Sequence, residues 1–215
     1  MTTTPSIPGH APMEDWVLRA LARWPNVPAL FGWLALDRRG RWLIRGEPIS
    51  RPQILDTISR NYGADEYGRW YFQNGPQRGY VRLDTAPYVL WTCEGGEGLQ
   101  IHTGQRVRHP TRAFLDEEGS ILLLTEYGPA ALPDNELDWV LPRLDQAGVP
   151  VDEDQLAAAL ALPSGQATAL TLHLPEANLP LERLDRARAP KLLGFVRDPQ
   201  PRAGEQFAAA DSPEP

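Results

Sequence analysis

Tyrosine and arginine side chains alternate with apolar ones between Tyr67 and Leu83, and these residue types are suited to bind another molecule. A guanidinium group pairs with a carboxylate and also stacks on an aromatic ring. Tyrosine offers rigid contact area at interfaces. The stretch GRWYFQNGPQRGYVRL predicts two strands joined at NGPQ.

The pleat of the strands decides which side chains of this hairpin share a face. Because Pro76 has no amide hydrogen, we expect a four-residue loop closed by Gln73 and Arg78. That register sets Gly79 opposite Phe72 and leaves room for the ring. One face then belongs to the core and carries Trp70, Phe72, Gly79, Val81 and Leu83. The other, called here the Tyr/Arg face, carries Tyr67, Arg69, Tyr71, Gln73, Arg78, Tyr80 and Arg82.

Two interpretations of the Tyr/Arg face stay open. In the first it is a solvated sheet face on which arginine stems cover tyrosine rings. In the second it is a recognition surface for another protein or an acidic ligand. Nucleic acid is a weaker third case, because the chain has a net charge of −7 and lacks an RNP-like motif. We expect a non-enzymatic interaction protein that uses this face.

Patterns for catalysis, metal binding or phosphate binding do not occur in the sequence. It contains no G-x-G-x-x-G, no G-x-x-x-x-G-K-[ST] and no G-x-S-x-G. Cys93, His102 and His109 match no zinc spacing, and Cys93 is expected in the core. His173, in an alternating apolar strand, is expected to be exposed or hydrogen-bonded. We assign no catalytic residue, no cofactor and no metal site.

An alternative function remains open beside the interaction protein. It is a small-molecule-binding protein or an enzyme of unrecognised type, with a cleft between the sheet and the C-terminal segment. Whether the chain is an enzyme is therefore undecided, with the balance against it.

Charge is distributed unevenly along the 215 residues. Residues 37–112 hold 12 arginines against 8 acidic side chains, whereas residues 113–215 hold 7 basic against 18 acidic ones. Either the two parts attract each other, or the basic part faces an acidic partner. The single cysteine, the absence of a signal-type segment and the lack of a ~18-residue apolar run lead us to expect a cytoplasmic protein with no membrane contact. Its oligomeric state is left open.

Hydrophobic periodicity and turn signals place the elements that must hold these residues. Amphipathic helices are expected at 14–24 and at 50–63, the second with a capping box of Ser50 and Gln53 and an end at Gly63. Two strands flank the turn at residues 37–40. Further strands are expected at 69–73, 78–83, 88–93, 99–103, 111–115, 120–126 and 167–174, and helices at 135–144 and 153–162, the last with a capping box of Asp152 and Gln155.

This pattern predicts an α+β fold, a mainly antiparallel meander with three or four covering helices. ALDRRGRWLI and FLDEEGSILL share Leu-Asp-x-x-Gly, which indicates either a repeated β-hairpin-helix unit or shared turn chemistry. We expect disordered tails at 1–12 and 198–215, a main domain at 13–148 and a C-terminal helix-strand segment packed on it at 149–197.

Three strings, FGWLALDRRGRWLIRG, GRWYFQNGPQRGYV and LPLERLDRARAPKLLGFVRDP, resemble an uncharacterised proteobacterial family of short proteins, a domain of unknown function. The resemblance covers most of the chain, from about Met13 to Arg197. It implies one folded unit from a bacterium, and no activity, cofactor or site residue.

Overall fold

The computed structural model describes residues 15–24 and 27–209, and the chain divides into two compact units. Unit 1 comprises the described residues up to Asp37, Arg41–Asp84 and those from Phe195 onwards, and unit 2 comprises Arg38–Gly40 and Thr85–Gly194. The expected boundary between residues 148 and 149 lies within unit 2. The tail expected at 1–12 lies outside the described residues.

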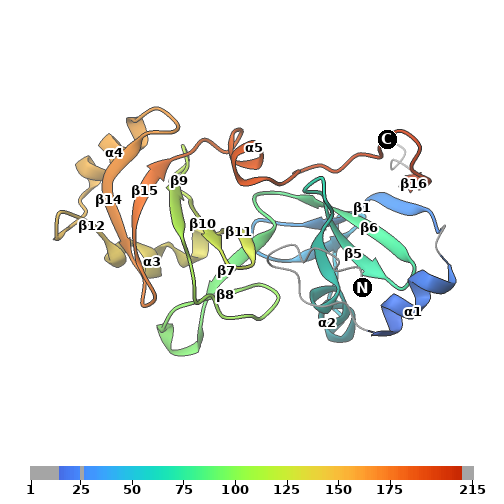
Figure 1. Ribbon diagram of the computed structural model, residues 1–215. Coiled ribbons are helices and arrows are strands. Elements are labelled where there is room, and N and C mark those ends of the chain that lie inside the picture. The colour runs from blue at the N-terminus through green and yellow to red at the C-terminus, as the bar shows by residue number, and fades with distance from the viewer. Residues whose placement is uncertain (1–14, 25–26, 210–215) are drawn as a thin grey trace, which may run out of the picture. The chain divides into compact units, whose positions relative to one another are not determined.

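Unit 1 is built on a seven-stranded mixed sheet (Figure 1). Its elements are α1 (Asp15–Arg23), β1 (Ala29–Leu36), β2 (Trp42–Ile44), β3 (Glu47–Pro48), α2 (Pro52–Arg60), β4 (Tyr62–Ala64), β5 (Trp70–Asn74), β6 (Gln77–Leu83) and β16 (Phe207–Ala209). The strand order is β3-β2-β1-β6-β5-β4, with β16 added to β1. β1 is therefore central, antiparallel to β2 and parallel to both β6 and β16.

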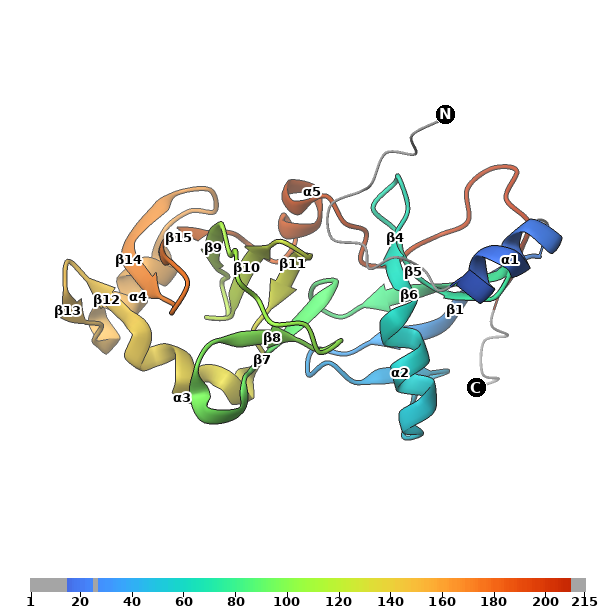
Figure 2. The ribbon, with the colours of Figure 1, turned by 60° about the horizontal axis from the view of Figure 1, so that its bottom comes forward.

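The two helices expected in unit 1 are confirmed, but the predicted capping box of α2 is wrong. The N-cap is Arg51, whose side chain makes no cap hydrogen bond. Ser50 and Gln53 each lie one residue before the N-cap and N3 positions that a capping box requires. Pro52 sets this start, because its fixed φ suits the first helical position. The helix also ends at Arg60 instead of Gly63, since the chain enters β4, and it lies beside β5 (Figure 2).

Unit 2 is built on a nine-stranded mixed sheet. Its strands are β7 (Tyr88–Thr92), β8 (Leu99–Ile101), β9 (Arg112–Leu115), β10 (Ile121–Thr125), β11 (Gly128–Ala131), β12 (Leu144–Gln146), β13 (Val149–Pro150), β14 (Ala167–His173) and β15 (Asn178–Arg183). Its helices are α3 (Leu137–Val140), α4 (Glu153–Ala161) and α5 (Ala189–Leu193), with short 3₁₀ turns η1 (Glu94–Gly96), η2 (Asp134–Glu136) and η3 (Leu141–Arg143).

Two helix predictions for unit 2 have different outcomes. The capping box of α4 is confirmed, because Asp152 accepts from the Gln155 N–H at 2.8 Å and the Gln155 side chain accepts from the Asp152 N–H at 3.1 Å. The continuous helix at 135–144 is wrong. The segment forms η2, α3 and η3 in succession, and Pro142 lies in η3, where it cannot donate an α-helical hydrogen bond.

The two sheets share one strand order. In unit 1 the parallel pair β1 and β6 joins two antiparallel trios, β3-β2-β1 and β6-β5-β4. In unit 2 the parallel pair β9 and β15 joins β11-β10-β9 and β15-β14-β12 in the same way. Unit 2 adds β7 and β8 beyond β11, and β13 beyond β12. The two copies of the Leu-Asp-x-x-Gly pattern thus lie in the β1–β2 and β9–β10 hairpins, which occupy the same position in the shared strand order.

Three hairpins close their turns with an aspartate side chain. Asp37 Oδ1 accepts from the backbone N–H four residues later, and Asp65 and Asp116 do the same. The glycine three residues after each aspartate has a positive φ, which a side chain would strain; these are Gly40 at 80°, Gly68 at 75° and Gly119 at 83°. Asp-x-x-Gly is therefore a physical turn signal in this chain.

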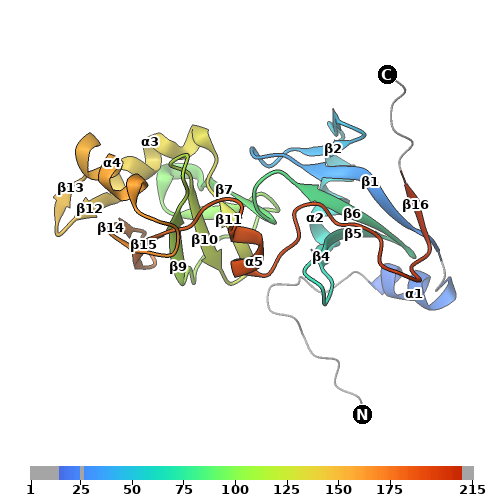
Figure 3. The ribbon, with the colours of Figure 1, turned by 90° about the horizontal axis from the view of Figure 1, so that it is seen from above.

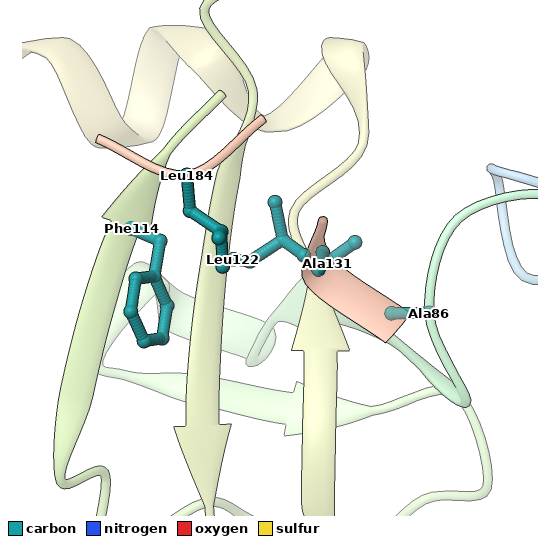
Figure 4. Close-up of a cluster of buried hydrophobic side chains, with 6 residues drawn as sticks. Ala86, Phe114, Leu122, Ala131 and Leu184 are labelled. Atoms are coloured by element: carbon teal, nitrogen blue, oxygen red, sulfur yellow. The ribbon is translucent and has the colours of Figure 1, made fainter. Parts of the chain in front are cut away.

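The fold class is α+β as predicted, with five α-helices among the described residues. Most strand pairs are antiparallel as predicted, but both sheets are mixed, because β1 with β6 and β16, β7 with β11, and β9 with β15 are parallel. Parallel pairs join segments far apart in sequence, so local turn signals do not reveal them. One core cluster of unit 2 lies under β9–β11 and α5 (Figure 4) and comprises Ala86, Phe114, Leu122, Ala131, Leu184 and Ala189.

Among the described helices, none has both the length and the apolar character to cross a bilayer.

Candidate functional site

The β5–β6 hairpin has the register expected from the sequence. Phe72 pairs with Gly79, and Gln73 pairs with Arg78. Pairing continues to Asn74 and Gln77, so the turn contains two residues instead of four. The space above Gly79 belongs to Leu34 of β1, since a Cβ at position 79 would lie 2.8 Å from Leu34 Cδ1. The expectation that this glycine makes room for the Phe72 ring is therefore wrong.

The Tyr/Arg face is largely buried, contrary to the solvated or open face expected from the sequence. The relative exposure of Arg69 is 5%, of Tyr71 4%, of Gln73 0% and of Tyr80 4%. Two of the seven residues are exposed, Tyr67 and Arg82, and Arg78 is half-buried. The opposite face is also covered, with Trp70, Val81 and Leu83 buried as predicted and Phe72 half-buried.

The side chains that cover the Tyr/Arg face come from distant parts of the sequence. Phe31 of β1 stacks on Tyr80 with ring centroids 4.4 Å apart and forms a buried cluster with Tyr80 and Tyr71. Residues 198–209, expected to be disordered, instead lie along unit 1 and end in β16 beside β1 (Figure 3). The prediction of a tail is wrong for these residues, and positions 210–215 lie outside the described chain.

Arg69 is the centre of this site. Its Nε donates to Asp65 Oδ2 at 2.8 Å, and Nη2 donates to Tyr80 Oη at 2.9 Å. Nη1 and Nη2 donate to the two carboxylate oxygens of Glu205 at 2.8 and 2.6 Å, and Nη1 also donates to the Gln200 carbonyl at 3.1 Å. The guanidinium thus has a fixed inner edge and an outer edge that holds a carboxylate at two points.

Aromatic rings surround the Arg69 guanidinium. Its carbon lies 4.5 Å from the ring centroid of Tyr80, 5.4 Å from that of Tyr67 and 6.0 Å from that of Phe31. Arg202 stacks on Tyr67 at 3.5 Å. We call Arg69 with Phe31, Tyr67 and Tyr80 the Arg69 site.

A second arginine is packed in the same way on the neighbouring part of the face. The Arg78 guanidinium lies 4.4 Å from the Tyr71 ring centroid, and its Nε donates to Gln73 Oε1 at 3.1 Å. Gln73 in turn donates to the Gly75 carbonyl at 2.9 Å. This part of the face is a closed hydrogen-bonded layer that supports the hairpin.

The ionisable groups at and beside the Arg69 site have pKa values that lie further from pH 7 than their ordinary values. The hydrogen bond to Glu205 raises the pKa of Arg69. The hydrogen bond from Arg69 lowers the pKa of Glu205 to about 2. Burial raises the pKa of Tyr71 and Tyr80. Each of these groups therefore keeps one protonation state around neutral pH.

Many arginines in the basic part of the chain already pair with carboxylates. Within the described residues, at least seven of its 12 arginines pair with a carboxylate of the same chain. The seven are Arg39, Arg41, Arg60, Arg69, Arg82, Arg106 and Arg112.

The cysteine and histidines that the sequence singled out do not form one centre. His102 is buried, its Nδ1 accepts from the Val89 N–H at 3.2 Å, and burial lowers its pKa to about 3. His173 instead lies near the surface between Asp145 at 2.5 Å and Asn178 at 2.8 Å. Cys93 is half-buried. Within the described residues, no group of three or more His, Cys, Asp or Glu side chains could hold a metal ion.

Comparison with known proteins gives a family for the chain. Residues 13–200 match the family model DUF2944, described as "Protein of unknown function (DUF2946)". The chain belongs to this family. The uncharacterised family expected from the sequence is thereby confirmed, and no curated protein matches the chain.

Two solved structures from another family of unknown function are similar to this DUF2944 member. A DUF1285 family protein from Silicibacter pomeroyi DSS-3 has a TM-score of 0.47 and 18% identity, covering 73% of this chain and 84% of that chain. A DUF1285 family protein from Shewanella baltica OS155 has a TM-score of 0.36 and 13% identity, covering 48% and 86% respectively. The DUF2944 match contains the whole Tyr/Arg face and ends before Glu205 and β16.

Proposed function

We propose that this chain is a non-enzymatic interaction protein of the bacterial cytoplasm that binds a carboxylate-bearing protein partner at the Arg69 site. The observation that carries the proposal is the two-point pairing of Arg69 with Glu205 at 2.6 and 2.8 Å. Asp65 and Tyr80 hold the guanidinium from behind, so its outer edge is oriented before any carboxylate arrives. A preorganised, fork-shaped donor is what two-point recognition of a carboxylate requires.

The protonation states of the site support binding over acid–base catalysis. A general acid or base works best when its pKa lies near the operating pH. At this site the pKa of Arg69 and Tyr80 is raised, and the pKa of Glu205, which pairs with Arg69, falls to about 2. At neutral pH each group therefore keeps one protonation state. Such groups can position a ligand and form ion pairs, but they are poorly suited to act as a general acid or base.

The exposed members of the Tyr/Arg face supply the rim of the proposed interface. Tyr67 is 46% exposed, and its ring lies beside the Arg69 guanidinium. Arg82 is exposed on β6, two residues after Tyr80 and on the same side of the strand. The surface thus combines the buried guanidinium of Arg69 with the exposed side chains of Tyr67 and Arg82. Tyrosine and arginine are enriched among the residues that contribute most to binding at protein interfaces. Nucleic acid is disfavoured, because the chain carries a net charge of −7.

Site-specific photocrosslinking tests the proposal. A photoreactive phenylalanine analogue replaces Tyr67, and in a matched control it replaces Ile54, which is 41% exposed on α2 of the same unit. We expect a discrete crosslinked protein at position 67, with the attachment point near Asp or Glu residues when mapped by mass spectrometry. The Arg82→Glu variant should lower its yield at least threefold. Equal crosslinking at positions 67 and 54, or no crosslinked protein at 67, would contradict the proposal.

A further inference from the structure

The chain's own residues 205–209 lie on unit 1 as a bound peptide would. β16 runs parallel to the first residues of β1, with Ala29 paired to Phe207 and Phe31 paired to Ala209 (Figure 3). The Ala29 N–H donates to the Gln206 carbonyl at 3.0 Å. This is strand addition, in which backbone bonds supply affinity and alternate side chains supply selectivity.

The first residues of β1 form an edge that, among the residues the structure describes, pairs with β16 on that side. β2 pairs with Leu34, Ala35 and Leu36, which are the last residues of β1. A register irregularity separates Leu30 from Leu34 along the β1–β6 pairing. Without β16, the backbone groups of residues 29–31 on that side would form a short open edge, able to accept another strand.

Two side chains of the segment give it a recognisable pattern. The Glu205 carboxylate is held at two points by Arg69. Two residues later, the Phe207 ring meets the Phe31 ring edge-on, with centroids 6.1 Å apart. Residues two apart on an extended chain point to the same side. The pattern that fits the surface is a carboxylate followed, two residues on, by an aromatic ring.

The side chains at the end of the segment remain exposed. Phe207 is 50% exposed, and Ala208 and Ala209 are exposed. Arg69 would keep its bonds to Asp65 and Tyr80 if Glu205 left. Half of the Phe207 surface therefore stays in solvent, although Phe31 beneath it is buried. A partner side chain that buries more apolar surface against unit 1 would bind more tightly than Phe207 does.

We propose that an extended segment of a partner protein, with a carboxylate two residues before an aromatic side chain, replaces residues 205–209 and adds to β1 as a parallel strand. This inference rests on the proposed function and specifies its partner. The chain's own segment acts as a tethered competitor at an effective concentration in the millimolar range. A second copy of the chain offers the same segment but lacks the high effective concentration of the tethered one, so it would not displace it. The occupant is therefore a different protein whose aromatic side chain fits better than Phe207.

Peptide binding to the full chain tests this inference. The probe is a fluorescein-labelled peptide with the sequence of residues 202–209, RAGEQFAA. We expect fluorescence anisotropy to show at least tenfold tighter binding to the Glu205→Gln/Phe207→Ala double variant than to the wild-type chain. The matched control, Ile54→Ala, removes another half-exposed apolar side chain of unit 1 and should leave binding at the wild-type level.

Variant peptides test the pattern itself. Replacing the glutamate by glutamine, or the phenylalanine by alanine, should weaken binding to the double variant at least fivefold, and a tryptophan in place of the phenylalanine should strengthen it. No binding to the double variant, equal binding to the double variant and wild type, or equal binding of all peptides would overturn the inference. A wild-type dimer that exchanges residues 205–209 between copies, detected by light scattering and crosslinking, would also overturn it.

A second measurement applies if circular dichroism shows that the double variant is unfolded. A 4-fluorophenylalanine at position 207 of the otherwise wild-type chain reports the ring's environment by ¹⁹F NMR. Millimolar tryptophan peptide should move this signal to the position of the free peptide, and an unmoved signal would overturn the inference. Crosslinking at Tyr67 that persists beside a negative peptide result would leave the proposed function standing and reject this inference alone.

Discussion

Arg69 and Glu205 lie 136 residues apart in sequence, yet they form a two-point ion pair with N–O distances of 2.6 and 2.8 Å. The pair is asymmetric. The Arg69 side chain is 6% exposed and has further partners in Asp65 and Tyr80, whereas the Glu205 side chain is 31% exposed. Arg69 is thus part of the interior of unit 1, and Glu205 belongs to a segment laid over it.

This asymmetry predicts unequal costs of removing the two partners. Arg69→Ala leaves the Asp65 carboxylate buried without its cation and should lower the free energy of unfolding by about 3–5 kcal/mol. Glu205→Gln removes an ion pair whose place water can take, and should cost about 1 kcal/mol or less. Urea unfolding followed by tryptophan fluorescence measures both. Equal losses would show that Glu205 is as integral to the fold as Arg69.

Acidification should release residues 205–209 before unit 1 unfolds. The folded pKa of Glu205 is about 2, lowered from an ordinary value of 4.5. Its stabilising contribution is therefore complete above pH 4.5 and is lost as the pH falls through the interval down to about 2. Amide hydrogen exchange at Ala29, which donates to the Gln206 carbonyl, should accelerate over that interval. In Glu205→Gln the exchange, corrected for intrinsic pH dependence, should show no such step.

His173 should titrate above its ordinary value. The hydrogen bond to Asn178, and then the one to Asp145, raise its pKa above 6.5. Its contribution to stability is therefore complete below pH 6.5 and is lost as the pH rises through the folded pKa. NMR titration of the imidazole in the wild type and in Asp145→Asn measures the shift. An unchanged midpoint in the variant would contradict the role given to Asp145.

Two glycines with the same backbone conformation should respond differently to alanine. Gly40 has φ +80° and Gly46 has φ +86°, so either substitution carries a backbone cost of about 1–2 kcal/mol. At Gly40 the new Cβ would also lie 2.8 Å from the Trp91 ring and 3.1 Å from His102 Cβ, whereas nothing lies within 4 Å at Gly46. We expect Gly40→Ala to lower the free energy of unfolding by ~1–3 kcal/mol more than Gly46→Ala does, and therefore to show the lower melting temperature of the two variants. Similar losses would show that the ring moves aside freely.

Local chemistry made several elements predictable from the sequence. Strand alternation and the NGPQ turn set the Phe72–Gly79 register, because both act over a few residues. The capping box of Asp152 and Gln155 is equally local, with both bonds inside one helical turn. The shared Leu-Asp-x-x-Gly pattern marked equivalent hairpins, because the aspartate closes its own turn.

Exposure of the Tyr/Arg face could not be predicted in this way. Alternation grouped Arg69, Tyr71 and Tyr80 on one side, but whether that side meets water depends on what else in the chain reaches it. Phe31 arrives through the parallel β1–β6 pair, and Glu205 arrives after the chain has passed through the whole of unit 2. Neither contact has a local sequence signal, because parallel pairing and long-range ion pairs leave no fixed spacing between the partners.

The amino-acid order therefore settled which side chains of the β5–β6 hairpin stand together, since pleat and turn geometry act between neighbours. Folding in three dimensions settled that most of them are covered, and by what. A buried guanidinium requires carboxylates and a phenol placed around it from several strands, and for Arg69 these are Asp65, Tyr80 and Glu205. Only the tertiary structure brings the Glu205 carboxylate to the outer edge of the Arg69 guanidinium and so reveals the proposed interaction site.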